Sequence, residues 1–279
     1  MSFDNITVVI NTFHSQDIIN ECLDSIDLNL KVIIIENSDN INFKADLENK
    51  YSNVNCYLTG DNLGYAKGNN LGISKVKTEY ALILNPDAKL RKDTIKNFLI
   101  TAKKIKNFSI IGPADQDEFS SIKNHKFQED VFQVNYLKGF AMFLNLNEFK
   151  DIGFFDENFF IYLEEIDLCK RVKNNNKTIY LDKNIKIDHL GGKSHNENIQ
   201  YEMELSRNWH WMWSKFYFNK KHYGFLSSSI KIFPNFVSAI IKILFYSLLL
   251  KKHKINIYKM RLLGILNSFM GKKSFYRID

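Results

Sequence analysis

Short, uninterrupted apolar runs alternate with amphipathic stretches in the first third of the chain. The runs at 6–10, 32–35 and 81–85 are rich in aliphatic residues, as is typical of strands that are buried on both faces. Between the first two runs, the apolar residues of 18–26 recur at helical spacing. A second helix is expected over 43–51, followed by a short strand at 55–58. This alternation predicts a largely parallel β-sheet that is covered by helices on both faces.

Polar residues follow each of the three apolar runs. They are the loop from Asn11 to Ser15, the acidic stretch from Glu36 to Asp39, and the turn Asn85-Pro86-Asp87. The carboxyl ends of parallel strands meet at one edge of a sheet, and that edge is where ligands bind in open α/β folds. From the pattern alone, Asp87 is equally well a turn residue or a ligand. Ser15 or Asp17 is expected to cap the 18–26 helix, and the Gly- and Asn-rich stretch 60–72 is expected to be a loop that merges into a helix.

The second half of the chain is less regular. A helix is expected over 92–106 and a strand over 109–112, before a polar, loop-rich stretch at 113–130. The apolar residues of 134–144 indicate one strand that is interrupted by a turn or bulge at Lys138-Gly139.

The stretch 154–192 carries the densest chemistry. A helix that starts near Leu163 places Glu164, Asp167 and Arg171 on one face, with Glu165 pointing elsewhere. The acidic cluster either complements a helix dipole or supplies a general base. His189 follows a strand-like run at 184–187 and is, on its own, either structural or a ligand.

The composition fits one α/β domain with an extension, or two small domains: 279 residues, of which 45% are apolar. Three cysteines without a C-x-x-C pair argue against disulfides and zinc. The amino-terminal residues lack the pattern of a signal peptide, so we expect a cytoplasmic protein. The net charge of +7 is unevenly spread: residues 205–279 hold 14 Lys or Arg and one acid, against 24 basic and 30 acidic residues before them.

The basic tail contains an apolar segment, 225–250, that is long enough to cross a bilayer. Lys231, Lys242 and Pro234 interrupt it, and mid-membrane lysines are costly. With five further basic residues just after it, the segment favours attachment to an anionic membrane surface over two alternatives, a dimer- or core-packing helix and a true span. Nucleic-acid binding is not expected, because the basic residues are interleaved with aliphatic runs. The aromatic stripe in 206–224 is interpreted as core or interface.

Taken together and in order, the motifs resemble the inverting family 2 glycosyltransferases, in particular their rhamnosyltransferase-like branch. The resemblance covers residues 5–215 and is carried by "INTFHS", "IIIENSDN", "GDNLGYAKGNNLGI", "ALILNPDAKL", "LKGFAMF", "FFDENFFIYLEEIDLCKRV" and "IDHLGG". It implies a GT-A fold of the α/β class: a Rossmann-like mixed sheet flanked by helices. The expected division is 1–215 for this domain, with a nucleotide-sugar half at about 1–112 and an acceptor half at 113–215, and 216–279 for a helical, basic, membrane-associating extension.

The resemblance also implies site residues. The metal ligands would be Asp87, at the second position of the family's D-x-D motif, and His189, holding Mn²⁺ or Mg²⁺. Glu165 would be the catalytic base, with Glu164 as the alternative, and the acceptor side would include Asp156, Glu157 and Asp167. The residues expected to contact the donor are Asn11, Thr12, Phe13, Glu36, Asn62, Gly64, Lys67, Gly68, Asn69 and Asn85.

The reaction that the resemblance implies is inverting transfer from a nucleoside-diphosphate sugar to a saccharide acceptor. The expected donor is dTDP-L-rhamnose or a UDP-hexose, and the expected acceptor is a lipid-linked saccharide of bacterial surface-polysaccharide assembly. The expected location is the inner face of the cytoplasmic membrane, and a homodimer through the C-terminal helices stays open. The alternatives are an inactive glycosyltransferase-like scaffold and a sugar nucleotidyltransferase; the latter is disfavoured because "NTFHSQ" lacks glycine.

Overall fold

The computed structural model describes residues 3–114, 130–189 and 200–278, in two compact units. The first, here called the sheet unit, comprises the described residues of 3–63, 67–155 and 165–189. The second, here called the helical unit, comprises 64–66, 156–164 and 200–278. The chain therefore passes from the helical unit to the sheet unit between Glu164 and Glu165.

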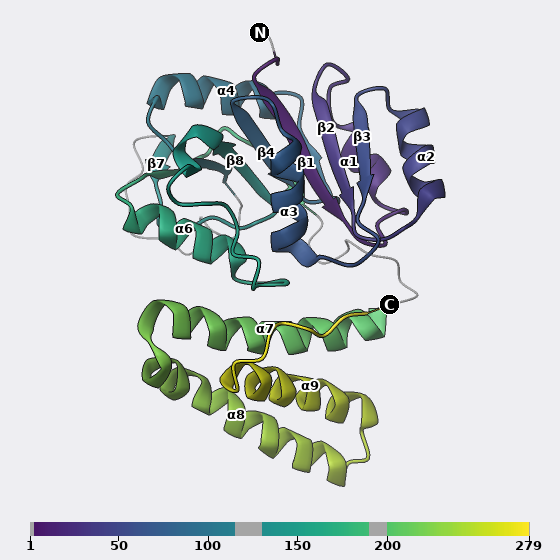
Figure 1. Cartoon of the computed structure of the whole chain (residues 1–279), viewed down its shortest axis with the longest axis vertical. Coiled ribbons are helices and arrows are strands. Elements are labelled where there is room, and N and C mark those ends of the chain that lie inside the picture. Colours follow the sequence, from purple (N-terminus) through teal and green to yellow (C-terminus); the bar gives the residue numbers. More distant parts are fainter. Residues whose placement is uncertain (1–2, 115–129, 190–199, 279) are drawn as a thin grey trace. The chain divides into compact units, whose positions relative to one another are not determined.

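One eight-stranded sheet forms the centre of the sheet unit, in the order β3-β2-β1-β4-β8-β6-β9-β7. Its first four members pair in parallel, β8 runs antiparallel to β4 and β6, and β7 runs antiparallel to β9. The predicted mixed sheet is thus confirmed (Figure 1). The strands are β1 (Ile6–Thr12), β2 (Lys31–Glu36), β3 (Val54–Leu58), β4 (Tyr80–Leu84), β6 (Ile110–Pro113), β7 (Val131–Gln133), β8 (Ala141–Asn145) and β9 (Ile179–Asp182).

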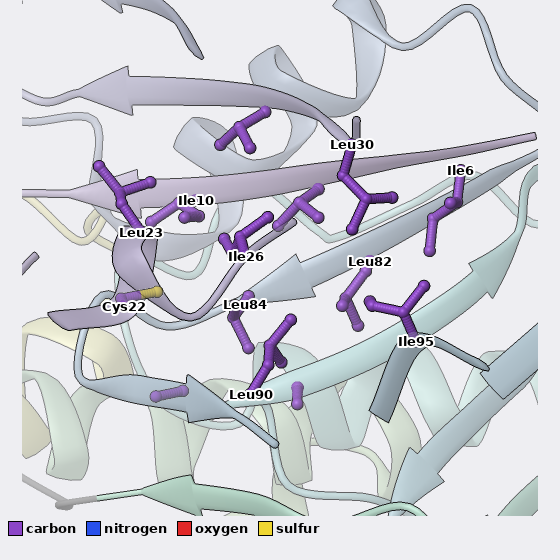
Figure 2. Close-up of a cluster of buried hydrophobic side chains, with 14 of the residues drawn as sticks. Ile6, Ile10, Cys22, Leu23, Ile26, Leu30, Leu82, Leu84, Leu90 and Ile95 are labelled. Atoms are coloured by element: carbon purple, nitrogen blue, oxygen red, sulfur yellow. The ribbon is translucent and has the colours of Figure 1, made fainter. Parts of the chain in front are cut away.

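Alternate residues of β1 face two different layers. Ile6, Val8 and Ile10 belong to a core that includes residues of α1 (Ile19–Asp24), α2 (Ile41–Lys50) and α4 (Thr94–Ile105). Figure 2 shows part of this core, with Cys22, Leu23 and Ile26 beside the strands. Every residue of β1 from Ile6 to Ile10 is buried, which is why the strand has no polar alternation.

The stretch predicted as a loop at 60–72 is mostly helix, because α3 (Gly64–Lys75) begins at Gly64. Its glycines allow α3 to lie close against the other face of β1. A Cβ on Gly72 would come within 2.3 Å of Val9 Cγ1, and one on Gly68 within 2.3 Å of Asn11 Oδ1. The glycines of 60–72 led to the prediction of a loop, but Gly68 and Gly72 are there because α3 packs closely against β1.

The predicted cap of the first helix is wrong. Its N-cap residue is Ile18, and no side chain caps it; the backbone carbonyl of Ser15 accepts from the N–H groups of Ile18 and Ile19 instead. The second helix does begin with a side-chain cap, because Asn40 accepts from the N–H of Phe43 at 3.0 Å.

The single interrupted strand predicted at 134–144 is also wrong. The chain forms β7 just before this range and β8 at Ala141–Asn145, and the two pair with different neighbours in the sheet. The 3₁₀ helix η1 (Leu146–Phe149) follows β8, and α6 spans Glu164–Asn174. The strand expected at 184–187 begins at Ile187, the last residue of the expected range. It is β10 (Ile187–His189), which pairs antiparallel with β5 (Ala88–Leu90) in a separate two-stranded ribbon.

The helical unit is built on α7 (Gln200–Tyr223), α8 (Phe225–Leu248) and α9 (Lys252–Phe269). A Cβ on Gly264 of α9 would lie 2.2 Å from the carbonyl oxygen of Trp209, so the backbones of α7 and α9 approach closely. The segment after α9 packs on α7, where Trp213 Nε1 donates to the carbonyl of Lys272 at 3.0 Å. The boundary expected at residue 215 falls inside α7, which packs as a whole with α8 and α9.

Candidate active site

Asp87 lies directly beyond β4, at the edge of the sheet where the parallel strands end. Its side chain is 1% exposed, and Oδ1 has no hydrogen-bond donor among the described residues. The turn that aims it is held by two backbone bonds: the N–H of Asn85 donates to Phe140 at 2.9 Å, and the N–H of Ala88 donates to Asn85 at 3.1 Å. A buried carboxylate oxygen without a donor is costly unless a cation or ligand satisfies it.

His189 is brought to Asp87 by the register of the ribbon, in which it pairs with Ala88. Its Nε2 lies 3.4 Å from Asp87 Oδ1, and its ring stacks on Phe140 with centroids 4.5 Å apart. A carboxylate beside an imidazole is a donor set that suits a divalent ion such as Mn²⁺. The two side chains therefore fit a metal site, although the described residues contain no group of three or more His, Cys, Asp or Glu that could hold one.

The ribbon is anchored by residues that the sequence did not single out. Arg91 makes a bidentate contact with Asp188, with Nη2 at 2.5 Å and Nε at 3.1 Å from Oδ1. Thr94 Oγ1 donates to the carbonyl of Lys186 at 2.6 Å. The contacts lie next to His189 in the chain and fix the strand that carries it. In the sequence, the only indication of the Arg91–Asp188 pair is that the two residues carry opposite charges, about a hundred positions apart.

Glu36 is fully buried where β1 and β2 end side by side. One of its oxygens accepts from Thr12 Oγ1 at 2.5 Å and the other from Ser38 Oγ at 2.7 Å. Asn37 joins the same two strands, because its Nδ2 donates to Asn11 Oδ1 at 2.5 Å. In this arrangement Glu36 joins the two loops, and its contact with a nucleotide stays a prediction.

The other predicted donor residues are spread over the same edge and the start of α3. Phe13 and Asn85 are partly exposed, and Asn62 precedes the helix. Lys67 is exposed, whereas Gly68 is buried against Asn11 of β1 and Asn69 is fully buried. Gly64 belongs to the helical unit, where its φ of +78° and its approach to Phe160 exclude a side chain. The roles of these residues remain predictions.

The acidic residues at the start of α6 have different environments. Glu164 is 4% exposed and Asp167 is fully buried, whereas Glu165 is partly exposed, as expected for residues on different faces. Asp167 accepts from Arg171 Nε at 2.8 Å, and Arg171 donates further to the carbonyls of Ile152, Gly153 and Phe154. Asp167 therefore fixes the loop that leads to 156–164.

Asp156 ties that loop to α7 within the helical unit. It accepts from Lys221 Nζ at 2.7 Å and from the Tyr217 hydroxyl at 3.0 Å. Burial alone raises the pKa of Asp156, but hydrogen bonds from Lys221 and Asn158 outweigh it and hold the pKa below its usual value. The neighbouring Glu157 is exposed. Lys221 and Tyr217 were not predicted, since both lie beyond the resembling motifs.

The fold is shared with solved glycosyltransferases of the GT-A class. A mannosyltransferase from Pyrobaculum calidifontis, PcManGT, in complex with GDP-Man and Mn²⁺ superimposes with a TM-score of 0.62 at 10% identity, over 96% of this chain and 88% of that one. At this identity the likeness shows the fold alone, and the fold is GT-A.

The sequence profile of the family described as "Glycosyl transferase family 2" matches residues 7–169. The chain therefore belongs to glycosyl transferase family 2. It is 26% identical to the low-salt glycan biosynthesis hexosyltransferase Agl10 of Haloferax volcanii, over 63% of this chain and 64% of that protein, so it spans less than two thirds of that relative. It is 22% identical to the rhamnosyltransferase WbbL of Escherichia coli K12, over 59% of this chain and 75% of that protein.

Proposed function

We propose that this protein is an inverting glycosyltransferase that moves a sugar from a nucleoside-diphosphate sugar to a saccharide acceptor. The observation that carries the proposal is the buried Asp87 beside His189, at the ligand-binding edge of a family 2 fold. Family 2 relatives include a hexosyltransferase and a rhamnosyltransferase, which supports a UDP-hexose or dTDP-L-rhamnose as donor.

Asp87 and His189 would hold a divalent ion. An ion bound there would neutralise the negative charge that develops on the departing diphosphate. Among the described ion pairs, one other joins a histidine to a carboxylate, His253 with Glu204. Both of its side chains are about half exposed, so it lacks the buried carboxylate that Asp87 provides. Asp87 is therefore the residue whose loss should be most damaging.

Glu165 is the proposed general base. It takes the proton of the acceptor hydroxyl while that oxygen attacks the anomeric carbon, and the bond between this carbon and the diphosphate oxygen breaks on the opposite face. Attack and departure on opposite faces invert the anomeric configuration. The partial exposure of Glu165 supports this assignment over Glu164, because a base must reach its substrate.

The test begins with a thermal-shift screen of nucleotide sugars with Mn²⁺ or Mg²⁺, followed by hydrolysis of the donors that bind. We expect Asp87→Asn to abolish hydrolysis and transfer, and the matched control Asp46→Asn, at an exposed position of α2, to retain both. Glu165→Gln should lower turnover by ~10²–10⁴-fold while donor binding persists. Full activity of either site variant would remove that residue from the mechanism, and a wild-type protein that binds no nucleotide sugar would contradict the proposed function.

We also propose that α8 attaches the protein to the inner face of the cytoplasmic membrane. Among the described residues it is the one helix long and apolar enough to cross a bilayer, and only 17% of its apolar window is buried. One face is apolar and exposed along its length: Leu226 74%, Ile230 66%, Phe233 62%, Leu244 62% and Leu248 85%. Lys231 and Lys242 instead contact the rings of Tyr223 and Tyr258. An apolar face with basic residues beside it suits an anionic membrane surface, where a lipid-linked acceptor is held.

Flotation with liposomes tests the attachment. The variant Leu226→Glu/Ile230→Glu should lose flotation with anionic liposomes, whereas Lys89→Glu, on an exposed position of the sheet unit, should keep it. Equal flotation of wild type and the double variant would rule out α8 as the anchor.

A further inference from the structure

The three tryptophans of the chain lie on α7 and have different surroundings. Trp209 and Trp213 are 1% and 3% exposed and belong to the core of the helical unit. Trp211 is 40% exposed, although it sits between them in the sequence. Packing in a core therefore explains two of the three tryptophans of this aromatic stripe. It does not explain why position 211 carries a side chain as large as tryptophan.

The exposed indole meets one particular residue of the 156–164 loop. The rings of Trp211 and Tyr162 form an edge-to-face pair with centroids 5.5 Å apart and planes at 90°. Tyr162 lies three residues before Glu165, the proposed base, and in the same loop as Asp156 and Glu157, the predicted acceptor-side residues. The aromatic pair is thus part of the segment that leads directly into the proposed catalytic helix.

The backbone at this point is held in an unusual conformation. Tyr162 and the next residue, Leu163, have φ of +75° and +69°, which is rare for bulky side chains and persists only where surrounding contacts enforce it. The preceding carbonyl, of Ile161, accepts from Ser214 Oγ at 2.9 Å. The Phe160 ring stacks on His210, with ring centroids 4.5 Å apart, and the guanidinium carbon of Arg277 lies 3.8 Å from the centroid of the Phe160 ring. These contacts place the Tyr162 ring against Trp211 instead of in the core.

A cationic side chain accompanies the aromatic pair. Arg207 lies one helical turn before Trp211 on the same face of α7. Burial raises the pKa of the Tyr162 hydroxyl, and the positive charge of Arg207 opposes this rise. A guanidinium offers several hydrogen-bond donors in one plane, and a phenol offers one donor and an acceptor.

We infer that the exposed indole of Trp211, held by its edge-to-face contact with Tyr162, is the platform on which a ring of the acceptor saccharide stacks, with Arg207 and the Tyr162 hydroxyl binding its hydroxyl groups. The inference rests on the proposed function and names the acceptor side of that site. The face of an indole is electrostatically negative and attracts the C–H groups of a sugar ring, while hydroxyl groups at the rim are satisfied by charged and polar side chains. Tryptophan, tyrosine and arginine are also the side chains enriched among the residues that dominate the binding energy of protein interfaces.

Kinetics with varied acceptor and varied donor test the platform. Trp211→Ala should raise the acceptor KM about tenfold, with a much smaller effect on the donor KM, since the lost stacking serves the acceptor alone. Trp211→Phe, which keeps an aromatic face, should recover most of the loss. The control Tyr223→Ala removes another exposed aromatic ring of α7, 48% exposed, and should leave both KM values unchanged. An unchanged acceptor KM in Trp211→Ala, or equal damage to both KM values and no rescue by phenylalanine, would overturn the inference.

A second readout does not depend on turnover. Acrylamide quenches exposed tryptophans, so Trp211 should dominate the quenching of the wild-type protein. Methyl glycosides and disaccharides of the common hexoses are the probes, added one at a time. We expect at least one of them to protect the fluorescence of wild type and none to protect Trp211→Phe. If none protects wild type, the platform is refuted; if one protects while no nucleotide sugar is bound or hydrolysed, the platform stands and the proposed transfer reaction is what fails.

Discussion

His210 makes the stability of the helical unit depend on pH. Its side chain is fully buried on α7, with Nε2 2.9 Å from the carbonyl oxygen of Tyr276 and Nδ1 2.9 Å from Ser274 Oγ. A neutral ring that donates from Nε2 and accepts at Nδ1 satisfies both contacts. Burial is the main cause that lowers the pKa of His210 to about 3. The bond to the Tyr276 carbonyl acts in the opposite direction, and the charge of Arg277 adds a smaller lowering effect.

The sign of the effect follows from the two states. An unfolded histidine has a pKa of about 6.5, so between pH 6.5 and about 3 the unfolded chain binds one proton more than the folded one. The stability that the neutral His210 ring contributes is therefore fully present above about pH 6.5 and is lost as the pH falls from there toward about 3. One proton corresponds to about 1.4 kcal/mol per pH unit, or about 2 kcal/mol between pH 6.5 and 5.

Denaturant titrations from pH 8 to 5, followed by tryptophan fluorescence, measure this loss. The signal reports on the helical unit alone, because all three tryptophans lie on α7. His210→Gln keeps a donor and an acceptor but cannot take up the proton, so it should flatten the slope below pH 6.5 by about 1.4 kcal/mol per unit. The control Trp213→Phe loosens the same packing but changes no titrating group. Its free energy of unfolding should differ from that of wild type by the same amount at every pH. Parallel pH profiles for wild type and His210→Gln would refute the reasoning.

Three further changes have defined outcomes. Gly264→Ala forces a methyl group against the carbonyl of Trp209, which is backbone and cannot yield, and should lower the stability of the helical unit by about 1–3 kcal/mol in a denaturant titration. Lys221→Met removes the charged donor of Asp156, a carboxyl whose pKa is lowered. We expect the free energy of unfolding to fall by about 1–3 kcal/mol above pH 4 and the difference to disappear as the pH falls through the lowered pKa. A difference that stays constant with pH would contradict this. Arg91→Ala should cost less than about 1 kcal/mol of stability, since the pair is half exposed, yet weaken Mn²⁺ binding in calorimetry about tenfold by freeing β10.

The sheet was predictable because burial on both faces leaves a clear trace in sequence. The apolar runs of β1, β2 and β4 have no polar alternation, and the parallel register that this implies puts Thr12, Glu36 and Asn85 at one edge. The nearness of Asp87 and His189 followed from the resemblance, and the ribbon of β5 and β10 supplies its physical cause.

Other features depended on contacts between distant residues. The glycines of α3 indicated a loop until the strand beneath them, with Val9 and Asn11, explained why they lack side chains. The assignment of residues near 134–144 to β7 and β8 depends on partners elsewhere in the sheet, which no local pattern contains. The role of Asp167 depends on Arg171 and the three carbonyls it binds, and the exposure of Trp211 depends on which face of α7 the other helices cover.

The most direct test of the central claim is a proton NMR time course of nucleotide-sugar hydrolysis with Mn²⁺ and no acceptor, using the donor that the thermal-shift screen selects. Inverting transfer to water predicts that the first anomer released has the configuration opposite to that of the donor. It also predicts that Asp87→Asn releases none, while the control Asp46→Asn behaves as wild type. Release of the sugar with its configuration retained, or hydrolysis that survives in Asp87→Asn, would contradict the account.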